Sequence, residues 1–324
     1  MGIYTKVADP AGDKWVEVGA DGGGALTPAE IVSAPVKVSG DSDPIEWTVK
    51  QTDGTQKKVT VLPGGTSGAQ KNTFEVTLSP GVLPGLMVGA GGTGGRSSQS
   101  QYPAGGGGAG GVIGTGANVP VILPVQETAT YTVTVGSTTI APNTIQGEPT
   151  TLAVQGQTPF ASAVGGGRGL AIYTAYQVGA RSGGSGGGGA GGTSPYIDIG
   201  EGVPGQGNRG GSVEDYSNTP TGGGGGYGSE GGSNGDGGAG FDLATALNLD
   251  ANDGITGSFL AQVSVDGFIA GGGSGGGTAT AGGGAPQGDG KNFTGSGGGG
   301  DTGTANPGGN GGAGAVYIIT DPPA

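Results

Sequence analysis

Glycine dominates this chain, and its placement limits the folds that are open to it. The 324 residues include 85 glycines, far above the roughly 7% of an average protein. Nearly unbroken glycine runs recur after residue 72, and those of seven residues or more occupy residues 89–95, 105–111, 183–192, 222–228, 231–240, 271–284, 295–303 and 308–314. Because hydrophobic residues make up only 32% of the chain, ordinary side-chain packing cannot account for this part of the fold.

Three structures compete to explain the glycine runs. Flexible linkers are the usual meaning of such composition, but segments typical of β-strands lie between these runs. Collagen needs glycine at every third position and abundant proline, whereas these runs are nearly solid and the chain has 20 prolines. The third structure is a bundle of polyglycine II helices, which have three residues per turn and no internal hydrogen bonds. The sequence favours this third structure.

A polyglycine II bundle explains why the runs tolerate so few other residues. Every N–H and C=O group must pair with a neighbouring helix, and contact between backbones on all sides leaves no room for a Cβ atom. Interior helices are therefore nearly pure glycine, while edge helices can carry alanine, serine or threonine on their outer side. Residues 105–111 and 183–192 fit this pattern. We expect a rigid scaffold, although ordering glycine costs more backbone entropy than ordering any other residue.

The first 71 residues have a different character and predict a small N-terminal β domain. Residues 45–50 and 58–62 alternate apolar and polar side chains, and Asp53-Gly54 between them is a strong hairpin signal. Trp47 and Val49 are expected to face a core. The lysines of this segment are expected to be solvated on the strand faces, with a docking patch as the alternative, and they include Lys50, Lys57 and Lys58.

Short strands are also expected within the glycine-rich part. Alternation or β-branched residues predict them at residues 73–78, 129–136, 259–265 and 315–320. The predicted fold class is therefore mostly β and irregular. Residues 1–71 form the small N-terminal β domain, and residues 72–324 form a glycine-rich polyglycine II helix bundle edged by short β-strands.

Charge and missing residue types exclude several kinds of function. The net charge of −13 works against non-specific binding to nucleic acid or anionic membranes. The chain has no cysteine and no histidine, which excludes disulfides, Cys/His zinc sites and catalysis by Ser-His-Asp or Cys-His groups. We expect no signal peptide and no membrane insertion, because no apolar segment has the required length. Synthesis in a cytoplasm is expected, with release by another route such as lysis.

The order of motifs resembles the glycine-rich domain of phage tail and fibre adhesins and of related virion or bacterial surface proteins. The resemblance covers roughly residues 72–322. It is carried by segments in which a glycine run adjoins an apolar strand or a turn, at residues 105–113, 131–136, 160–167, 254–257, 268–273, 302–309 and 312–319. The chain departs from the pattern after Gly136, where a Ser-Thr-Thr-Ile segment follows, and over residues 242–266, which hold fewer glycines than the pattern has.

The resemblance implies a virion structural protein that presents receptor-binding loops, most simply a tail-fibre or tail-tip adhesin. Residues 1–71 would bind other virion proteins, and the loops would contact a polysaccharide or outer-membrane protein on the host surface. Analogy with fibre proteins suggests a homotrimer. A non-binding capsid decoration or fibre spacer is the alternative. A polysaccharide-degrading enzyme is a third hypothesis, which the missing histidine and cysteine and the scarcity of acid pairs oppose.

Aromatic and basic residues in the loops are the candidate ligand-binding groups. Tyrosine could stack on sugar rings and arginine could meet acidic sugar groups. The candidates are Tyr102, Tyr196, Arg209, Tyr216 and Tyr227. The structural alternative is that each tyrosine covers glycine backbone at the edge of the bundle, and we favour it for any single residue.

No cofactor, catalytic residue or metal site is predicted. Residues 248–254 resemble part of a calcium loop, but the EF-hand pattern needs glycine where Asp253 stands and glutamate where Phe259 stands. This segment is therefore interpreted as a turn. Glu214-Asp215 could be half of a glycosidase pair, but adjacent acids in a polar loop are usually solvated.

Overall fold

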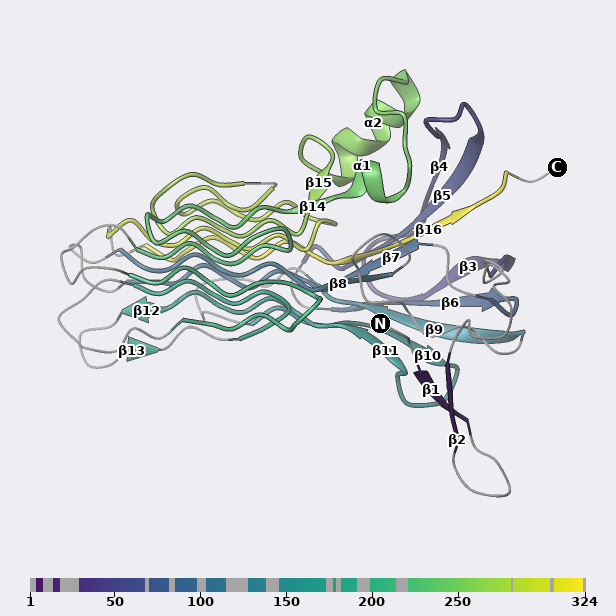
Figure 1. The fold of residues 1–324 in the computed structure, drawn as a ribbon, viewed down its shortest axis with the longest axis horizontal. Coiled ribbons are helices and arrows are strands. Elements are labelled where there is room, and N and C mark those ends of the chain that lie inside the picture. The colour runs from purple at the N-terminus through teal and green to yellow at the C-terminus, as the bar shows by residue number, and fades with distance from the viewer. Residues whose placement is uncertain are drawn as a thin grey trace.

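The protein combines a β-sheet region with a layer of extended glycine segments that lie side by side (Figure 1). The computed structural model describes residues 4–7, 14–17, 29–67, 70–81, 85–97, 103–114, 128–137, 146–172, 177–178, 182–190, 199–213, 221–280, 282–303 and 306–322. The described part is mostly β, with two five-stranded antiparallel sheets and two helices. This agrees with the predicted fold class at the level of secondary structure.

The first sheet has the strand order β4-β5-β16-β7-β8. Its strands are β4 (Ile45–Lys50), β5 (Gln56–Pro63), β16 (Ala315–Thr320), β7 (Gly85–Val88) and β8 (Val112–Gly114). The predicted strands at 45–50, 58–62 and 315–320 are confirmed, and β4 and β5 form the hairpin expected around Asp53-Gly54. Val49 is buried and Trp47 partly so, as predicted.

The second sheet has the strand order β11-β10-β9-β6-β3. Its strands are β11 (Ala161–Ala163), β10 (Thr150–Val154), β9 (Ala129–Val135), β6 (Asn72–Leu78) and β3 (Ile31–Ser39). Strict alternation in β6 and β9 buries every second side chain, because successive residues of a strand point to opposite faces. The predicted strands at 73–78 and 129–136 are thus confirmed.

The first sheet is covered on both faces. Leu62, Val316 and Ile318 pack with Phe74 and other side chains of the second sheet in one apolar cluster. The alternate residues of the same strands, including Val61 and Tyr317, join a second cluster with side chains of the two helices. The result is three layers, in the order second sheet, first sheet, helices. This explains why β5 is buried at five consecutive positions instead of alternating.

Each five-stranded sheet contains strands from before and from after the predicted domain boundary at residue 72. Strand β3 pairs with β6, and β5 pairs with β16. Residues 31–63 therefore share their sheets with the glycine-rich part. The boundary predicted between residues 71 and 72 does not coincide with a break in the strand pairing, because β5 pairs along one edge with β16 and β6 pairs along one edge with β3.

The prediction of a strand at residues 259–265 is wrong, because this segment belongs mostly to a helix. Helix α2 (Gly254–Val263) buries Thr256, Phe259, Leu260 and Val263, a spacing of three and four residues that gives a helix one buried face. Alternate apolar residues at 259, 261, 263 and 265 also fit a strand, so the pattern is ambiguous. The Asp253 carboxylate favours the helix, because it accepts a hydrogen bond from the Thr256 N–H and caps the helix N-terminus.

Short elements complete the fold. Helix α1 (Leu243–Ala246) precedes α2, and β14 (Phe241–Asp242) pairs with β15 (Phe268–Ile269) to close this helical insert. Two further hairpins are formed by β1 (Tyr4–Val7) with β2 (Lys14–Glu17) and by β12 (Ala171–Ile172) with β13 (Gln177–Val178). The insert, residues 241–269, occupies the region where the sequence has fewer glycines than the family pattern.

Candidate functional site

The described parts of the glycine runs are joined by backbone hydrogen bonds and belong to no α-helix or β-strand. The segment at 105–111 is the best example, because every one of its N–H groups donates to another segment. Its donors reach, in chain order, the carbonyl oxygens of Leu170, Gly222, Gly298, Gly167, Gly225, Gly295 and Val164, at distances of 2.7 to 3.1 Å. Every third residue therefore donates its N–H to the same neighbouring segment.

The carbonyl groups of this segment follow the same period. The oxygens of Gly105 and Gly108 accept from Gly95 and Gly92, and the oxygen of Gly106 accepts from Gly188. Taken together, residues 105–111 are bonded to six neighbours in the described part of the chain, at 164–170, 222–225, 295–298, 89–95, 185–188 and 273. The buried N–H and C=O groups of this segment therefore find partners on all sides. A strand in a β-sheet differs, because it bonds to only two neighbours.

Glycine is required in this layer because the segments are in direct backbone contact. A Cβ atom added at Gly105, Gly106 or Gly107 would lie 2.0, 2.1 or 2.2 Å from the carbonyl oxygen of a neighbouring segment. Ala109 is the exception in the run, and its methyl group is buried in the apolar cluster beneath the helices. The segment thus carries a side chain at a position where it faces the core.

Arg209 and Tyr227, two of the predicted ligand-binding residues, lie on neighbouring segments but turn to different partners. The guanidinium of Arg209 forms an ion pair with Glu230 at 2.9 Å, and this hydrogen bond raises the pKa of Arg209. The Arg209 side chain remains 48% exposed. The two segments are connected through Asn208, whose side-chain amide donates to the Tyr227 carbonyl oxygen at 2.6 Å.

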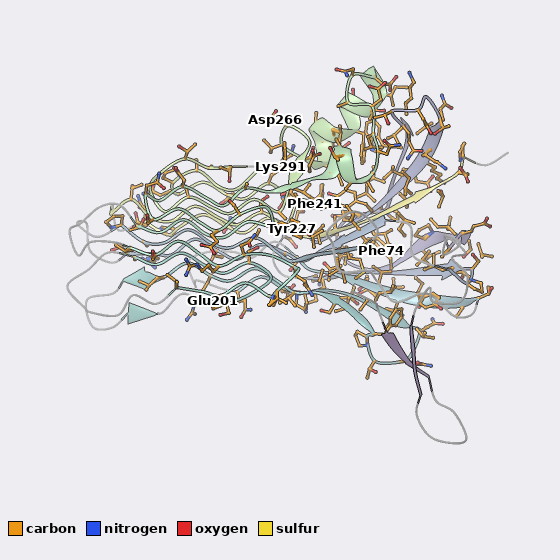
Figure 2. All side chains as sticks on the ribbon, viewed as in Figure 1. Phe74, Glu201, Tyr227, Phe241, Asp266 and Lys291 are labelled. Atoms are coloured by element: carbon orange, nitrogen blue, oxygen red, sulfur yellow. The ribbon has the colours of Figure 1, made fainter. Side chains whose placement is uncertain are left out.

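The Tyr227 ring packs edge-on against Phe241, with the ring centroids 4.9 Å apart (Figure 2). It contacts the apolar cluster beneath the helices, and burial raises the pKa of its hydroxyl. The ring thus packs on apolar side chains, whereas the structural alternative placed each tyrosine over glycine backbone. A ligand-binding role for Tyr227 stays a prediction. Tyr102, Tyr196 and Tyr216 lie outside the described residues, so their ligand-binding role stays a prediction.

Residues 248–254 connect the two helices, which agrees with the prediction that this segment is a turn. Asn248 has a φ of +55° and follows the end of α1, and its N–H and that of Leu249 donate to Thr245 and Ala244. This is a Schellman motif, in which asparagine can take the left-handed position. Asp253 then caps α2. No group of three or more carboxylates arranged to hold a metal ion occurs among the described residues.

A layered β fold continued by a hydrogen-bonded glycine layer defines the structural class of this protein. The chain matches the family described as "Glycine-rich domain" over residues 66–320, and it belongs to that family. No curated protein and no solved structure matches the chain. In the described part, no helix is long and apolar enough to cross a membrane.

Proposed function

We propose that the glycine layer is a bundle of polyglycine II helices. The observation that carries this proposal is the period of three in the hydrogen bonds of residues 105–111, combined with their six bonded neighbours. A helix with three residues per turn directs its N–H and C=O groups outward along directions that repeat every third residue. The close approach of added Cβ atoms to neighbouring carbonyl oxygens supports the same geometry.

We further propose that this bundle is the rigid scaffold of a non-enzymatic virion structural protein, a tail-fibre or tail-tip adhesin. The order of glycine runs and strands resembles such adhesins, and membership in the glycine-rich domain family is consistent with that resemblance. In this proposal residues 1–71 bind other virion proteins, and loops between the glycine segments bind a receptor on the host surface. Loops on a rigid scaffold are common places for binding residues.

A capsid decoration or fibre spacer is the second candidate, and one observation favours it. Arg209 pairs with Glu230 and Tyr227 packs against Phe241 within the protein, so both side chains have partners that are not a ligand. A spacer needs stiffness and no receptor, which the hydrogen-bonded glycine layer would supply alone.

Two measurements on particles that carry the protein test these proposals. Antibody-gold labelling locates the protein, and purified protein is added as a competitor of particle adsorption to host cells. Label at a fibre or tail tip together with competition supports the adhesin. Label on a shaft or capsid without competition supports the spacer. Absence of the protein from purified particles would refute both.

A further inference from the structure

The helical insert and the tip of the β4–β5 hairpin enclose an open cleft, which is lined in part by the turn at residues 248–254. Thr52 in the hairpin donates its backbone N–H to the Asn248 carbonyl oxygen, and the Asp250 N–H donates to the Lys50 carbonyl oxygen. These bonds fix the hairpin against the insert. The cleft between them has a volume of about 420 Å³, within the range of small-molecule sites.

An aromatic ring forms one side of the cleft. Phe268 lines it and is 39% exposed. A tight turn fixes the backbone of Phe268, because Val265 and Phe268 exchange both backbone hydrogen bonds. The two residues between them, Asp266 and Gly267, have positive φ angles of 51° and 86°, which is the geometry of a type I′ turn.

The polar side chains of the cleft differ in how many hydrogen bonds and ion pairs they form within the protein. Asp242 accepts hydrogen bonds from the Thr245 N–H and hydroxyl. Asp250 accepts from the Asn252 N–H and lies 3.8 Å from the Lys50 ammonium. These two carboxylates are therefore partly satisfied by residues of the fold.

Other groups in the cleft have spare capacity. Among the described residues, no hydrogen bond reaches the Asp266 carboxylate or the Asn252 side-chain amide, and Asn248 uses only its amide oxygen, which accepts from the Thr52 hydroxyl at 2.5 Å. Lys291 interacts electrostatically with Asp266 (both labelled in Figure 2). Its ammonium donates instead to the carbonyl oxygens of Ala261 and Ser264 at the end of α2.

We propose that this cleft binds a neutral saccharide, with the Phe268 ring against the C–H face of one sugar. A sugar hydroxyl both donates and accepts, so it requires carboxylate acceptors and amide donors side by side. Asp266, Asn248 and Asn252 supply that mixture within one cleft. The amphipathic sugar ring also suits an exposed aromatic side chain bordered by polar groups.

Charge selects against the competing ligand classes. Three carboxylates line the cleft, while the two nearby lysines, Lys50 and Lys291, do not line it, so anionic sugars are disfavoured. A polycation would need several free carboxylates, but Asp242 and Asp250 are engaged internally. The neutral saccharide is the remaining class that uses both the ring and the amides.

The saccharide proposal does not depend on the protein's place in a particle. If the adhesin proposal holds, the cleft would identify the receptor class. The test uses purified full-length protein, so its failure would leave the particle location unaffected.

Isothermal titration tests the cleft with four neutral probes, namely maltotetraose, cellotetraose, mannotetraose and chitotetraose, in buffer containing EDTA. Spermidine serves as a cationic probe. We expect at least one tetrasaccharide to bind with a Kd below about 10 mM, a weak but measurable affinity. Phe268→Ala and Phe268→Leu are expected to weaken binding by roughly 10-fold or more, because both remove the ring. Asp266→Asn should also weaken it.

Ile255→Ala is the matched control, because Ile255 is an exposed apolar residue of the same insert (59% exposed) that does not line the cleft. Its affinity should stay within about 2-fold of the wild type, and melting curves verify that every variant is folded. Binding that persists in both Phe268 variants, or an equal loss in Ile255→Ala, would overturn the proposal. So would tighter binding of spermidine, or no binding by any tetrasaccharide.

Discussion

Replacement of a single interior glycine by alanine gives the most direct test of the glycine layer. Gly224 is suited to it, because a Cβ atom there would lie 1.9 Å from the Gly107 carbonyl oxygen. Ordinary contact between these atoms needs at least about 3.4 Å, so one segment must move by more than an ångström. The φ angle of Gly224 is not in the left-handed region, so the clash alone opposes the substitution.

The magnitude follows from what the movement breaks. Overpacking costs about 1–3 kcal/mol, and a buried backbone group left without its partner costs about 1–3 kcal/mol more. Gly224 donates to Gly273 and accepts from Gly238, both at 2.8 Å. We therefore expect Gly224→Ala to lower the free energy of unfolding by roughly 3–5 kcal/mol. At about 2–4 °C per kcal/mol, the melting temperature would fall by roughly 6–20 °C.

The size of the effect separates a packed layer from a flexible linker. In a linker, alanine restricts the chain equally in the folded and unfolded states, so the free energy of unfolding should hardly change. Gly254→Ala is the matched control, since Gly254 begins α2 and an added Cβ meets no atom within 4 Å. It should be neutral or raise the melting temperature slightly, because alanine favours helix. Scanning calorimetry of the three proteins suffices. A Gly224→Ala variant as stable as Gly254→Ala would refute the packed layer.

Two further predictions concern the buried face of the first sheet and the cap of α2. Burial raises the pKa of Tyr317, so the folded chain keeps a proton that the unfolded chain loses above about pH 10, and stability should fall there by about 1.4 kcal/mol per pH unit. Tyr317→Phe removes this pH dependence, although it also removes the hydrogen bond to the Phe293 carbonyl oxygen. Urea unfolding of both proteins between pH 9 and 11 measures it. Equal dependence of stability on pH in the two proteins would show that Tyr317 is not the cause. Asp253→Ala should lower the melting temperature and Asp253→Asn should preserve it, because asparagine also caps helices. Equal losses in the two variants would show that the cap is not the cause.

Strand positions could be predicted from the sequence where one periodicity was unambiguous. β4, β6 and β9 alternate cleanly, and each was expected within a residue or two of its bounds. The α2 segment was not, because its apolar residues satisfy a period of two as well as a helical face. Which strands pair could not be predicted from the sequence. The pairs β3–β6 and β5–β16 join segments far apart in the chain, and local sequence patterns do not indicate such contacts.

The candidate sites show a similar division. Tyrosines were singled out by residue type, and Tyr227 proves to pack on Phe241, which needs knowledge of a partner distant in sequence. The cleft was missed because it is assembled from a hairpin tip and an insert nearly 200 residues later, joined by contacts such as that between Thr52 and Asn248. One local signal was present, since Asp266-Gly267 is a strong hairpin dipeptide that places Phe268 beside the turn.

The position of β16 has a consequence for the order in which the protein can assemble. This strand lies between β5 and β7, so the first sheet stays divided until residues 315–320 have been synthesised. During that time β5 and β7 present open edges, which are liable to pair with other chains. Formation of such non-local contacts is slow. If the same contacts form after the folding transition state, they also slow unfolding. We therefore expect a protein that completes its folding late in synthesis and then unfolds slowly.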